Sequence, residues 1–357
     1  MKHILDNSSA MPILAYRDRK PTSAGKTLAN LRLTLACWNY DRTRALVDGR
    51  VAVDGVDLNY LTLPVEETFF RMLRYREFDA AEMSLSSYVM SLFSDDPHFI
   101  AIPVFPSRSF RHSCIFVNRL SGIREPKDLI GKKVGSPEYQ LTAPVWIRGI
   151  LSDEYAVPVL SARYFTGGQE EPGRIEKVKL ALPPEIHVEP IPPGKTLSQM
   201  LETGEIDALY TPRIPSSFRA RTGNVQRLFE NHAAVEKAYF KKTRIFPIMH
   251  TVVIRRDVYR KNPWVAQSLY KAFVAAQKET YKDLYEAAAL KLMLPWLLQH
   301  VEETRQIMGE DFWPYGFEKN VHTLETFLRY SHEQGLSKQR LDPHDLFAPE
   351  TFGVFKV

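Results

Sequence analysis

The sequence predicts an α/β protein of two similar lobes with a ligand cleft between them. One pattern, in which Thr, Met-Leu and an apolar residue before Asp-Ala recur at fixed spacing, occurs twice, over residues 68–80 and 196–208. Strand-like and helix-like segments also alternate along the chain, which is typical of mainly parallel sheets covered by helices. The length of 357 residues corresponds to about two domains. Clefts between domains are favoured places for small ligands.

Composition narrows the class of protein further. The chain is 44% hydrophobic and 25% charged, as expected for a globular protein with a large core. Its net charge of +5 suits an anionic ligand as well as nucleic acid. The basic residues are scattered without a long Lys/Arg block, so nucleic acid is not expected as a partner. Cys37 and Cys114 are expected to be reduced core residues, and no Cys/His spacing resembles a metal site.

The first 30 residues are expected to form an N-terminal tail. Their best apolar run, residues 10–16, contains Pro12 and ends at Arg17, whereas a secretory signal needs a continuous apolar core of about 7–15 residues. No later segment reaches the roughly 18 apolar residues of a membrane span. A cytoplasmic protein with no membrane partner is therefore expected.

The first lobe is expected over residues 31–128. Residues 31–37 alternate polar and apolar side chains, as a half-buried strand does, and residues 56–61 form a second strand. Pro64 opens a helix whose first turn holds Glu66, where a carboxylate suits the helix dipole. Further strands are expected at residues 78–83, 100–105 and 113–118.

The second lobe is expected over residues 129–247, and residues 248–357 return to the first lobe and add C-terminal helices. A strand near residue 134 leads to a helix over 143–151, and the Gly- and Pro-rich residues 155–184 are expected to be a loop. Strands at 188–191 and 245–254 and helices at 263–284, 287–308 and 324–334 complete the prediction.

Polar loops rich in Arg, Ser and Tyr follow most of the expected strands. They lie at residues 39–44, 84–88, 108–112, 136–142 and 210–213. In open α/β sheets, ligands bind outside the carboxyl ends of the strands, so these loops are expected to line the cleft.

Several of these loops also carry a family resemblance. The relevant segments are YDRTR (40–44), EMSLSSY (82–88), PVFPSR (103–108) with FRH (110–112), GSPEYQ (135–140), FPIMH (246–250) and MGEDFWPYG (308–316). With them the chain, from about residue 31 onward, resembles the 4,5-dihydroxyphthalate decarboxylase family. The resemblance implies a two-lobed, periplasmic-binding-protein-like type II fold. It also implies decarboxylation of 4,5-dihydroxyphthalate to 3,4-dihydroxybenzoate without an organic cofactor. Trp38-Asn39 replace the Gly-Asp of the family's first loop, which leaves the exact aromatic acid open.

The chemistry requires proton transfer, for which histidine is suited because it titrates near neutral pH. His112 and His250 are the candidate catalytic histidines, one as a base at the phenol and the other as an acid at the ring carbon. Glu82 is the third catalytic candidate, either as an acid itself or as the partner that orients a histidine. The alternative for each histidine is a hydrogen-bonded position in an interdomain strand. The carboxylates and histidines show no close spacing that demands a metal.

The carboxylates of the substrate call for arginine, whose planar fork binds them bidentately. The candidate substrate-binding residues are Asn39, Tyr40, Arg42, Ser84, Ser86, Ser87, Arg108, Arg111, Tyr139, Thr142, Arg148 and Arg213. Interlobe ion pairs, turn-capping serines and packed aromatic rings are the structural alternatives. Asp79 and Asp207 of the repeat are expected to be structural.

Two other classes of protein compete with an enzyme that acts on a small aromatic carboxylate. A solute-binding protein would hold the same ligand without changing it, because fold does not fix function. A ligand-binding regulatory domain is less well supported, since no DNA-binding helix pair is apparent. A homo-oligomer is left open.

Overall fold

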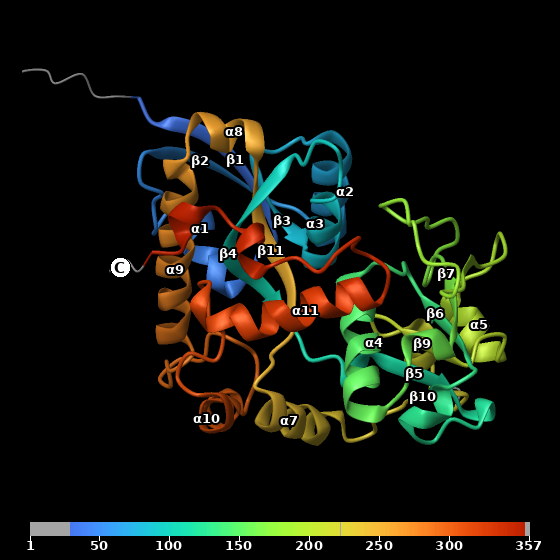
Figure 1. Ribbon diagram of the computed structural model, residues 1–357. Helices are drawn as coiled ribbons and strands as arrows, with labels where there is room; N and C mark the ends of the chain where they lie inside the picture. Colours follow the sequence, from blue (N-terminus) through green and yellow to red (C-terminus); the bar gives the residue numbers. More distant parts are fainter. Residues whose placement is uncertain (1–28, 222, 354–357) are drawn as a thin grey trace, which may run out of the picture.

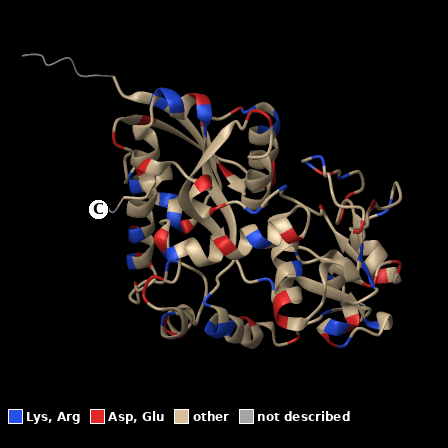
Figure 2. Ribbon diagram, in the orientation of Figure 1, with Lys and Arg blue, Asp and Glu red and all other residues tan. Residues whose placement is uncertain are grey.

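The computed structural model describes residues 29–221 and 223–353, and within these ranges the chain forms two β-sheets, each flanked by helices (Figure 1). The tail expected at the N-terminus lies, up to residue 28, outside the described residues. Basic and acidic residues are interspersed over both lobes, in line with the scattered charge of the sequence (Figure 2). Within the described ranges, none of the helices has the length and apolar character that a membrane span requires.

The first sheet forms the first lobe, with the strand order β2-β1-β3-β11-β4. Its strands are β1 (Leu31–Cys37), β2 (Val56–Thr62), β3 (Ala80–Ser84), β4 (Phe99–Arg108) and β11 (Ile248–Arg255). β1 pairs in parallel with β2 and β3, whereas β11 runs antiparallel to both of its neighbours, β3 and β4. The carboxyl ends of β1, β3 and β4 therefore lie at one edge of the sheet.

The second sheet forms the second lobe, with the strand order β10-β5-β9-β6-β7-β8. Its strands are β5 (Ile115–Asn118), β6 (Lys133–Ser136), β7 (Arg163–Thr166), β8 (Val188–Pro190), β9 (Ala208–Tyr210) and β10 (Val225–Arg227). β6 pairs in parallel with β7 and β9, and β5 runs antiparallel to both β9 and β10. Each sheet thus contains one reversed strand.

The chain passes between the sheets after β4 and again before β11. In both cases the strand that follows the passage, β5 or β11, is the reversed one of its sheet. The first passage comes earlier than the boundary expected at residue 128, because β5 pairs with β9 and β10 of the second sheet. The second passage lies between Arg227 and Ile248.

Helices cover both sheets and link the lobes. They are α1 (Arg44–Val47), α2 (Val65–Tyr75), α3 (Leu85–Ser91), α4 (Thr142–Tyr155), α5 (Leu197–Thr203), α6 (Ser216–Arg219), α7 (His232–Thr243), α8 (Arg256–Lys261), α9 (Trp264–Asp283), α10 (Leu297–Met308) and α11 (Val321–Glu333). In Figure 1, α2 and α3 lie on one side of the first sheet and α9 on the other, while α11 extends toward α4.

Three expected elements differ from the structure. Residues 84–88, expected as a loop, begin α3, because the Ser84 hydroxyl accepts a hydrogen bond from the Ser87 backbone N–H and caps the helix. The expected loop over 155–184 contains β7. The helix expected from residue 287 begins only at Leu297, directly after Pro295-Trp296, because proline disrupts a helix interior.

The repeated aspartates have the same structural role in both lobes. Asp79 Oδ2 accepts a hydrogen bond of 2.8 Å from the Thr34 backbone N–H of β1. Asp207 Oδ2 accepts one of 2.8 Å from the Lys133 backbone N–H of β6. Each aspartate N–H also donates to the carbonyl of the same partner residue. The prediction that these aspartates are structural is confirmed, since each fixes the start of its strand against the neighbouring one.

The junction between the lobes is tightly packed. Trp146 of α4 donates a hydrogen bond of 2.9 Å to the Ile248 carbonyl of β11, and its ring contacts Phe327 and Tyr330 of α11. A Cβ atom at Gly149 would lie 2.2 Å from the Tyr330 ring, so this close approach requires glycine. The packing holds the N-terminal end of α4 against the first lobe.

Candidate active site

A cavity of about 460 Å³ lies between the lobes, at the carboxyl ends of strands from both sheets. The first lobe contributes Trp38, Tyr40, Pro64, Val65, Glu66, Phe69, Ser84, Ser107, Ser109, Met249 and His250, together with Arg111 from the first crossing segment. The second lobe contributes Leu141, Thr142, Ala143, Lys177, Pro212 and Arg213. The cavity occupies the place at which the polar loops predicted a ligand cleft.

A buried carboxylate and a histidine form a pair at the floor of this cavity. Glu82 of β3 is fully buried, and its Oε1 lies 2.6 Å from Nδ1 of His250 on β11. The pairing of β11 with β4 shifts in register on both sides of His250. Such irregularities re-aim side chains, and here the histidine lines the cavity while contacting Glu82 behind it.

Four donors surround the Glu82 carboxylate. Oε1 also accepts a hydrogen bond of 2.6 Å from the Tyr40 hydroxyl, and Oε2 accepts bonds from the Trp38 backbone N–H at 3.0 Å and the Cys37 thiol at 3.4 Å. Burial raises the pKa of Glu82, but the hydrogen bonds and the charge of His250 outweigh burial, so that this pKa lies below its usual value. The carboxylate is therefore ionised near neutral pH.

The ionised Glu82 fixes the orientation of the His250 ring. Because an ionised carboxylate only accepts hydrogen bonds, Nδ1 of His250 carries the proton that it donates to Glu82. The edge-on ring of Phe69, with a centroid distance of 4.8 Å, holds the imidazole from the side. Nε2 is the ring nitrogen that lies outside this contact with Glu82.

Arg111 presents a cation to the same cavity without an acidic partner. The residue is 7% exposed, and its side-chain nitrogens contact sulfur: Nε lies 3.0 Å from Met249 Sδ and Nη1 lies 3.4 Å from Cys114 Sγ. Among the described residues no carboxylate forms an ion pair with it. Sulfur is a weak acceptor, so Arg111 retains its capacity to bind an anion.

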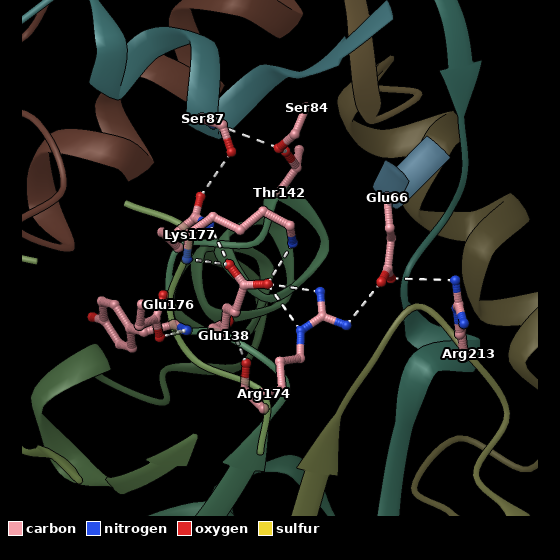
Figure 3. Close-up of polar contacts among 12 residues, drawn as sticks. Glu66, Ser84, Ser87, Glu138, Thr142, Arg174, Glu176, Lys177 and Arg213 are labelled. Atoms are coloured by element: carbon pink, nitrogen blue, oxygen red, sulfur yellow. Dashed lines mark hydrogen bonds and ion pairs between the residues drawn. The ribbon is translucent and has the colours of Figure 1, made fainter. Parts of the chain in front are cut away.

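A polar network from both lobes reaches the cavity through Glu66, Lys177 and Arg213 (Figure 3). Glu66 of α2 contacts Arg174 at 2.9 Å and Arg213 at 3.2 Å. Arg174 and Lys177 both contact the buried Glu138 of the second lobe, at 2.6 and 2.5 Å. Burial raises the pKa of Glu138, and the charges of Lys177 and Arg174 more than offset this, so that the pKa is lowered.

Hydroxyl groups join the lobes beside this network. Ser84 Oγ lies 2.9 Å from Thr142 Oγ1, which also accepts a hydrogen bond of 3.0 Å from the Ser86 backbone N–H. The Ser87 hydroxyl donates to Gln140 Oε1 at 3.0 Å. Ser84 and Thr142 line the cavity, whereas Ser86 and Ser87 lie behind it and connect α3 to the second lobe.

The structure brings six of the predicted residues to the cavity wall and does not bring the others there. The six are Tyr40, Ser84, Arg111, Thr142, Arg213 and His250, with Glu82 directly behind His250. Asn39 is exposed and lies outside the lining. Ser86, Ser87, Tyr139 and three of the arginines also lie outside the lining.

The three other arginines serve as structural cations. Arg42 lies between the rings of Tyr40 and Trp313, at 4.0 and 4.3 Å, and donates to the Pro106 carbonyl. The buried Arg108 donates to the carbonyls of Phe246 and Pro314 and to the side chain of Asn320. Arg148 donates to the Tyr139 carbonyl and to Gln334, and stacks on the Tyr139 ring at 3.8 Å. Each arginine connects segments that are distant in the sequence.

His112 lies in an aromatic enclosure outside the cavity. It is 1% exposed and contacts the rings of Phe229, Tyr239 and Tyr155, with centroid distances of 5.2, 5.2 and 6.1 Å. Neither ring nitrogen has a hydrogen-bond partner among the described residues. Burial lowers the pKa of His112 to about 4. The structure therefore does not bring His112 to the site at which the sequence predicted it.

This burial predicts an acid-sensitive fold. Above pH 6.5 His112 is neutral in both the folded and unfolded states, and its pKa shift costs nothing. As the pH falls from 6.5 to 4, the unfolded state takes up a proton that the folded state does not, which lowers the unfolding free energy by about 3 kcal/mol. The His112→Phe variant should lose this part of the pH dependence in urea denaturation measured from pH 4 to 7. Parallel curves for the two proteins would contradict this assignment.

Several lining residues were not among the predicted site residues. Glu66 and Phe69 belong to the helix after Pro64, for which the sequence indicated only a favourable helix dipole, and Lys177 falls in the segment predicted as a loop. Met249 precedes His250 and carries the sulfur that contacts Arg111. Pro64, Val65 and Glu66 follow the end of an expected strand, and this position could have identified Glu66 and Phe69 as lining residues.

The fold and the site together define an α/β protein of the periplasmic-binding-protein-like type II class with an acid–base pair in its cleft. Among solved structures, the periplasmic sulfonate-binding protein SsuA of Methylobacillus flagellatus KT is similar to 90% of this chain over 93% of its own, with a TM-score of 0.50 and 12% identity. That likeness confirms the predicted fold.

Sequence comparison identifies the family. No family model matches the chain. A 4,5-dihydroxyphthalate decarboxylase of Comamonas testosteroni is 41% identical over 330 residues, which span 92% of this chain and 100% of that protein. One from Pseudomonas putida is 42% identical over 211 residues, or 59% of this chain and 82% of that protein. The chain belongs to the 4,5-dihydroxyphthalate decarboxylase family.

Proposed function

We propose that this protein is a carboxy-lyase that converts 4,5-dihydroxyphthalate to 3,4-dihydroxybenzoate and carbon dioxide. The observation that carries the proposal is the Glu82–His250 pair in a cavity that also contains the unneutralised cation of Arg111. Membership in a family of decarboxylases supports the same reaction.

The pair supplies the proton that the reaction consumes. Protonated His250 delivers the proton from Nε2 to the ring carbon that bears the departing carboxylate. The hydroxyl para to that carbon stabilises the positive charge that develops in the ring. The bond between the ring and the carboxylate then breaks, its electrons restore the aromatic ring, and carbon dioxide leaves. His250 regains a proton from solvent, and the charge of Glu82 stabilises its protonated form throughout.

The rest of the cavity suits a dianionic aromatic ring. Arg111 and Arg213 are cations for carboxylates, and Ser84, Ser107 and Ser109 offer hydroxyl groups for hydrogen bonding. Apolar and aromatic side chains, Trp38 and Phe69 among them, provide surfaces for the ring. The bulky Trp38 in this lining keeps a related hydroxylated aromatic acid open as the substrate.

A solute-binding protein is the alternative function, and two observations argue against it. Binding an anion does not require a buried acid–base pair, which costs desolvation and is typical of sites that transfer protons. The similar proteins from both organisms are named as decarboxylases.

The test is turnover of 4,5-dihydroxyphthalate in D₂O. We expect one carbon dioxide for each 3,4-dihydroxybenzoate and one deuterium at the ring position that lost the carboxylate. Tight binding without turnover would overturn the proposal in favour of the solute-binding protein. A panel of other hydroxylated phthalates and isophthalates, assayed in parallel, defines the substrate. The cytoplasmic location and the homo-oligomer stay predictions.

A further inference from the structure

Of the described residues that line the cavity between the lobes, Glu66 is the only acidic one. Its presence is unexpected where an anionic substrate must bind, because like charges repel. Glu66 is held by two arginines of the opposite lobe, Arg174 at 2.9 Å and Arg213 at 3.2 Å. In Figure 3 its carboxylate lies between these two guanidinium groups.

The two arginines differ in how strongly they are held elsewhere. Arg174 also contacts the buried Glu138 through Nε at 2.9 Å and Nη2 at 2.6 Å. Arg213 is 64% exposed in its side chain, and Glu66 is its ion-pair partner among the described residues. Exposed pairs of this kind contribute little to stability, so the link between Glu66 and Arg213 is exchangeable.

A displaced Glu66 side chain has space to move into. A second cavity, of about 860 Å³ and called the outer cavity below, lies on the side of the network formed by Arg174 and Glu138, and Glu66 and Lys177 line both cavities. Arg74 and Lys179 are among the residues that line the outer cavity. A carboxylate that leaves Arg213 can therefore turn outward, remain solvated and keep its contact with Arg174.

We propose that Glu66 determines specificity by occupying Arg213 until a carboxylate of the substrate replaces it. This inference rests on the proposed function and identifies one of the two anion sites of the dicarboxylate. Arg111 binds one carboxylate of the substrate, and Arg213 exchanges Glu66 for the other. The product has a single carboxylate, so Glu66 returns to Arg213 and the product is held at one anion site only.

The exchange predicts that removing the charge of Glu66 affects dicarboxylates and monocarboxylates differently. The probes are phthalate and benzoate, which lack the ring hydroxyl that the reaction needs, and their binding is measured by titration calorimetry. Glu66→Gln should tighten phthalate binding by about three- to fivefold, the magnitude of an exposed ion pair. Benzoate binding should change less than twofold, and Glu66→Asp should stay near the wild type for both probes.

The neighbouring Glu67 provides a matched control. It lies on the same helix, and its ion pair, 2.7 Å to Arg71, is within the first lobe. Glu67→Gln removes the same charge and should leave both affinities unchanged. In an Arg213→Gln background, Glu66→Gln should no longer tighten phthalate binding, since the two residues act as a pair.

The other outcomes overturn the exchange. Equal tightening of both probes by Glu66→Gln would show a long-range charge effect. Weaker binding of both would show that Glu66 serves to hold the lobes together. In a wild type that turns over 4,5-dihydroxyphthalate, either result refutes the exchange and leaves the proposed function intact. A wild type that neither binds phthalate nor turns over the substrate refutes both.

Discussion

His250→Gln is expected to lower kcat by about 10²–10⁴-fold, the contribution of a positioned general acid. Glutamine retains a hydrogen-bonding side chain of similar length but cannot deliver a proton at neutral pH. Because Arg111 and Arg213, rather than His250, are the proposed sites for the carboxylates, the loss should appear in kcat rather than in the affinity for phthalate. Carbon dioxide release under saturating substrate measures it, with thermal unfolding as the check of the fold.

Two further variants make this result specific. Glu82→Gln keeps the size of the side chain but removes the charge that stabilises protonated His250, so kcat should fall here too, by a smaller factor. His112→Phe should retain kcat, because that histidine lies in an aromatic enclosure outside the cavity. A His250→Gln variant with wild-type turnover would remove His250 from the proposed mechanism. An inactive but folded His112→Phe variant would contradict the placement of His112 outside the site.

Arg111→Gln is expected to lower kcat/KM by about 10- to 100-fold, mainly through KM. Hydrogen bonds to charged groups contribute about 1.5–3 kcal/mol each, and Arg111 has only sulfur partners to lose in the free protein. Steady-state kinetics measures the separate effects on KM and kcat. Arg111→Lys should recover part of the loss, since it keeps the charge without the planar fork.

Arg163→Gln is the matched control for net charge. Arg163 is on β7, is 56% exposed in its side chain, and pairs with Glu189 away from the cavity. This variant should leave KM unchanged. An equal rise in KM for both variants would point to the net charge of the protein, and an unchanged KM in Arg111→Gln would place the substrate carboxylates elsewhere.

The sequence supports the prediction of the scaffold better than that of the site. Alternation identified β1 with its observed bounds, and the repeated Asp-Ala marked corresponding strand starts in the two lobes. These features are local, because strand periodicity and a short hydrogen-bonding side chain act within a few residues. The start of α10 could also have been predicted, since Pro295 stands two residues before Leu297.

The arginines show why the site is harder to predict. Arg42, Arg108 and Arg111 all stand in polar segments after strands, and residue type does not distinguish them. Arg42 and Arg108 donate to backbone carbonyls, whereas Arg111 is left with sulfur partners, and these differences arise from segments far apart in the sequence. A pattern within one segment contains no information on such partners.

The histidines differ for the same reason. His250 pairs with Glu82, which lies 168 residues earlier, and His112 acquires its apolar surroundings from α4, α7 and the segment between β10 and α7. Both partnerships depend on how the chain passes between the sheets. Residue type alone indicated only that each histidine could titrate near neutral pH.

The acid–base pair lies entirely on β3 and β11, adjacent strands of the first sheet, while Arg213 and Lys177 belong to the second lobe. This is a division of labour between two halves of one cleft. In the proposed mechanism, the residues that transfer the proton lie on one half, and some of the residues that bind the ligand's charge lie on the other. Redesign of the substrate range can therefore begin with the second lobe, for instance by exchanging the turn at Pro212-Arg213, without disturbing the reactive centre.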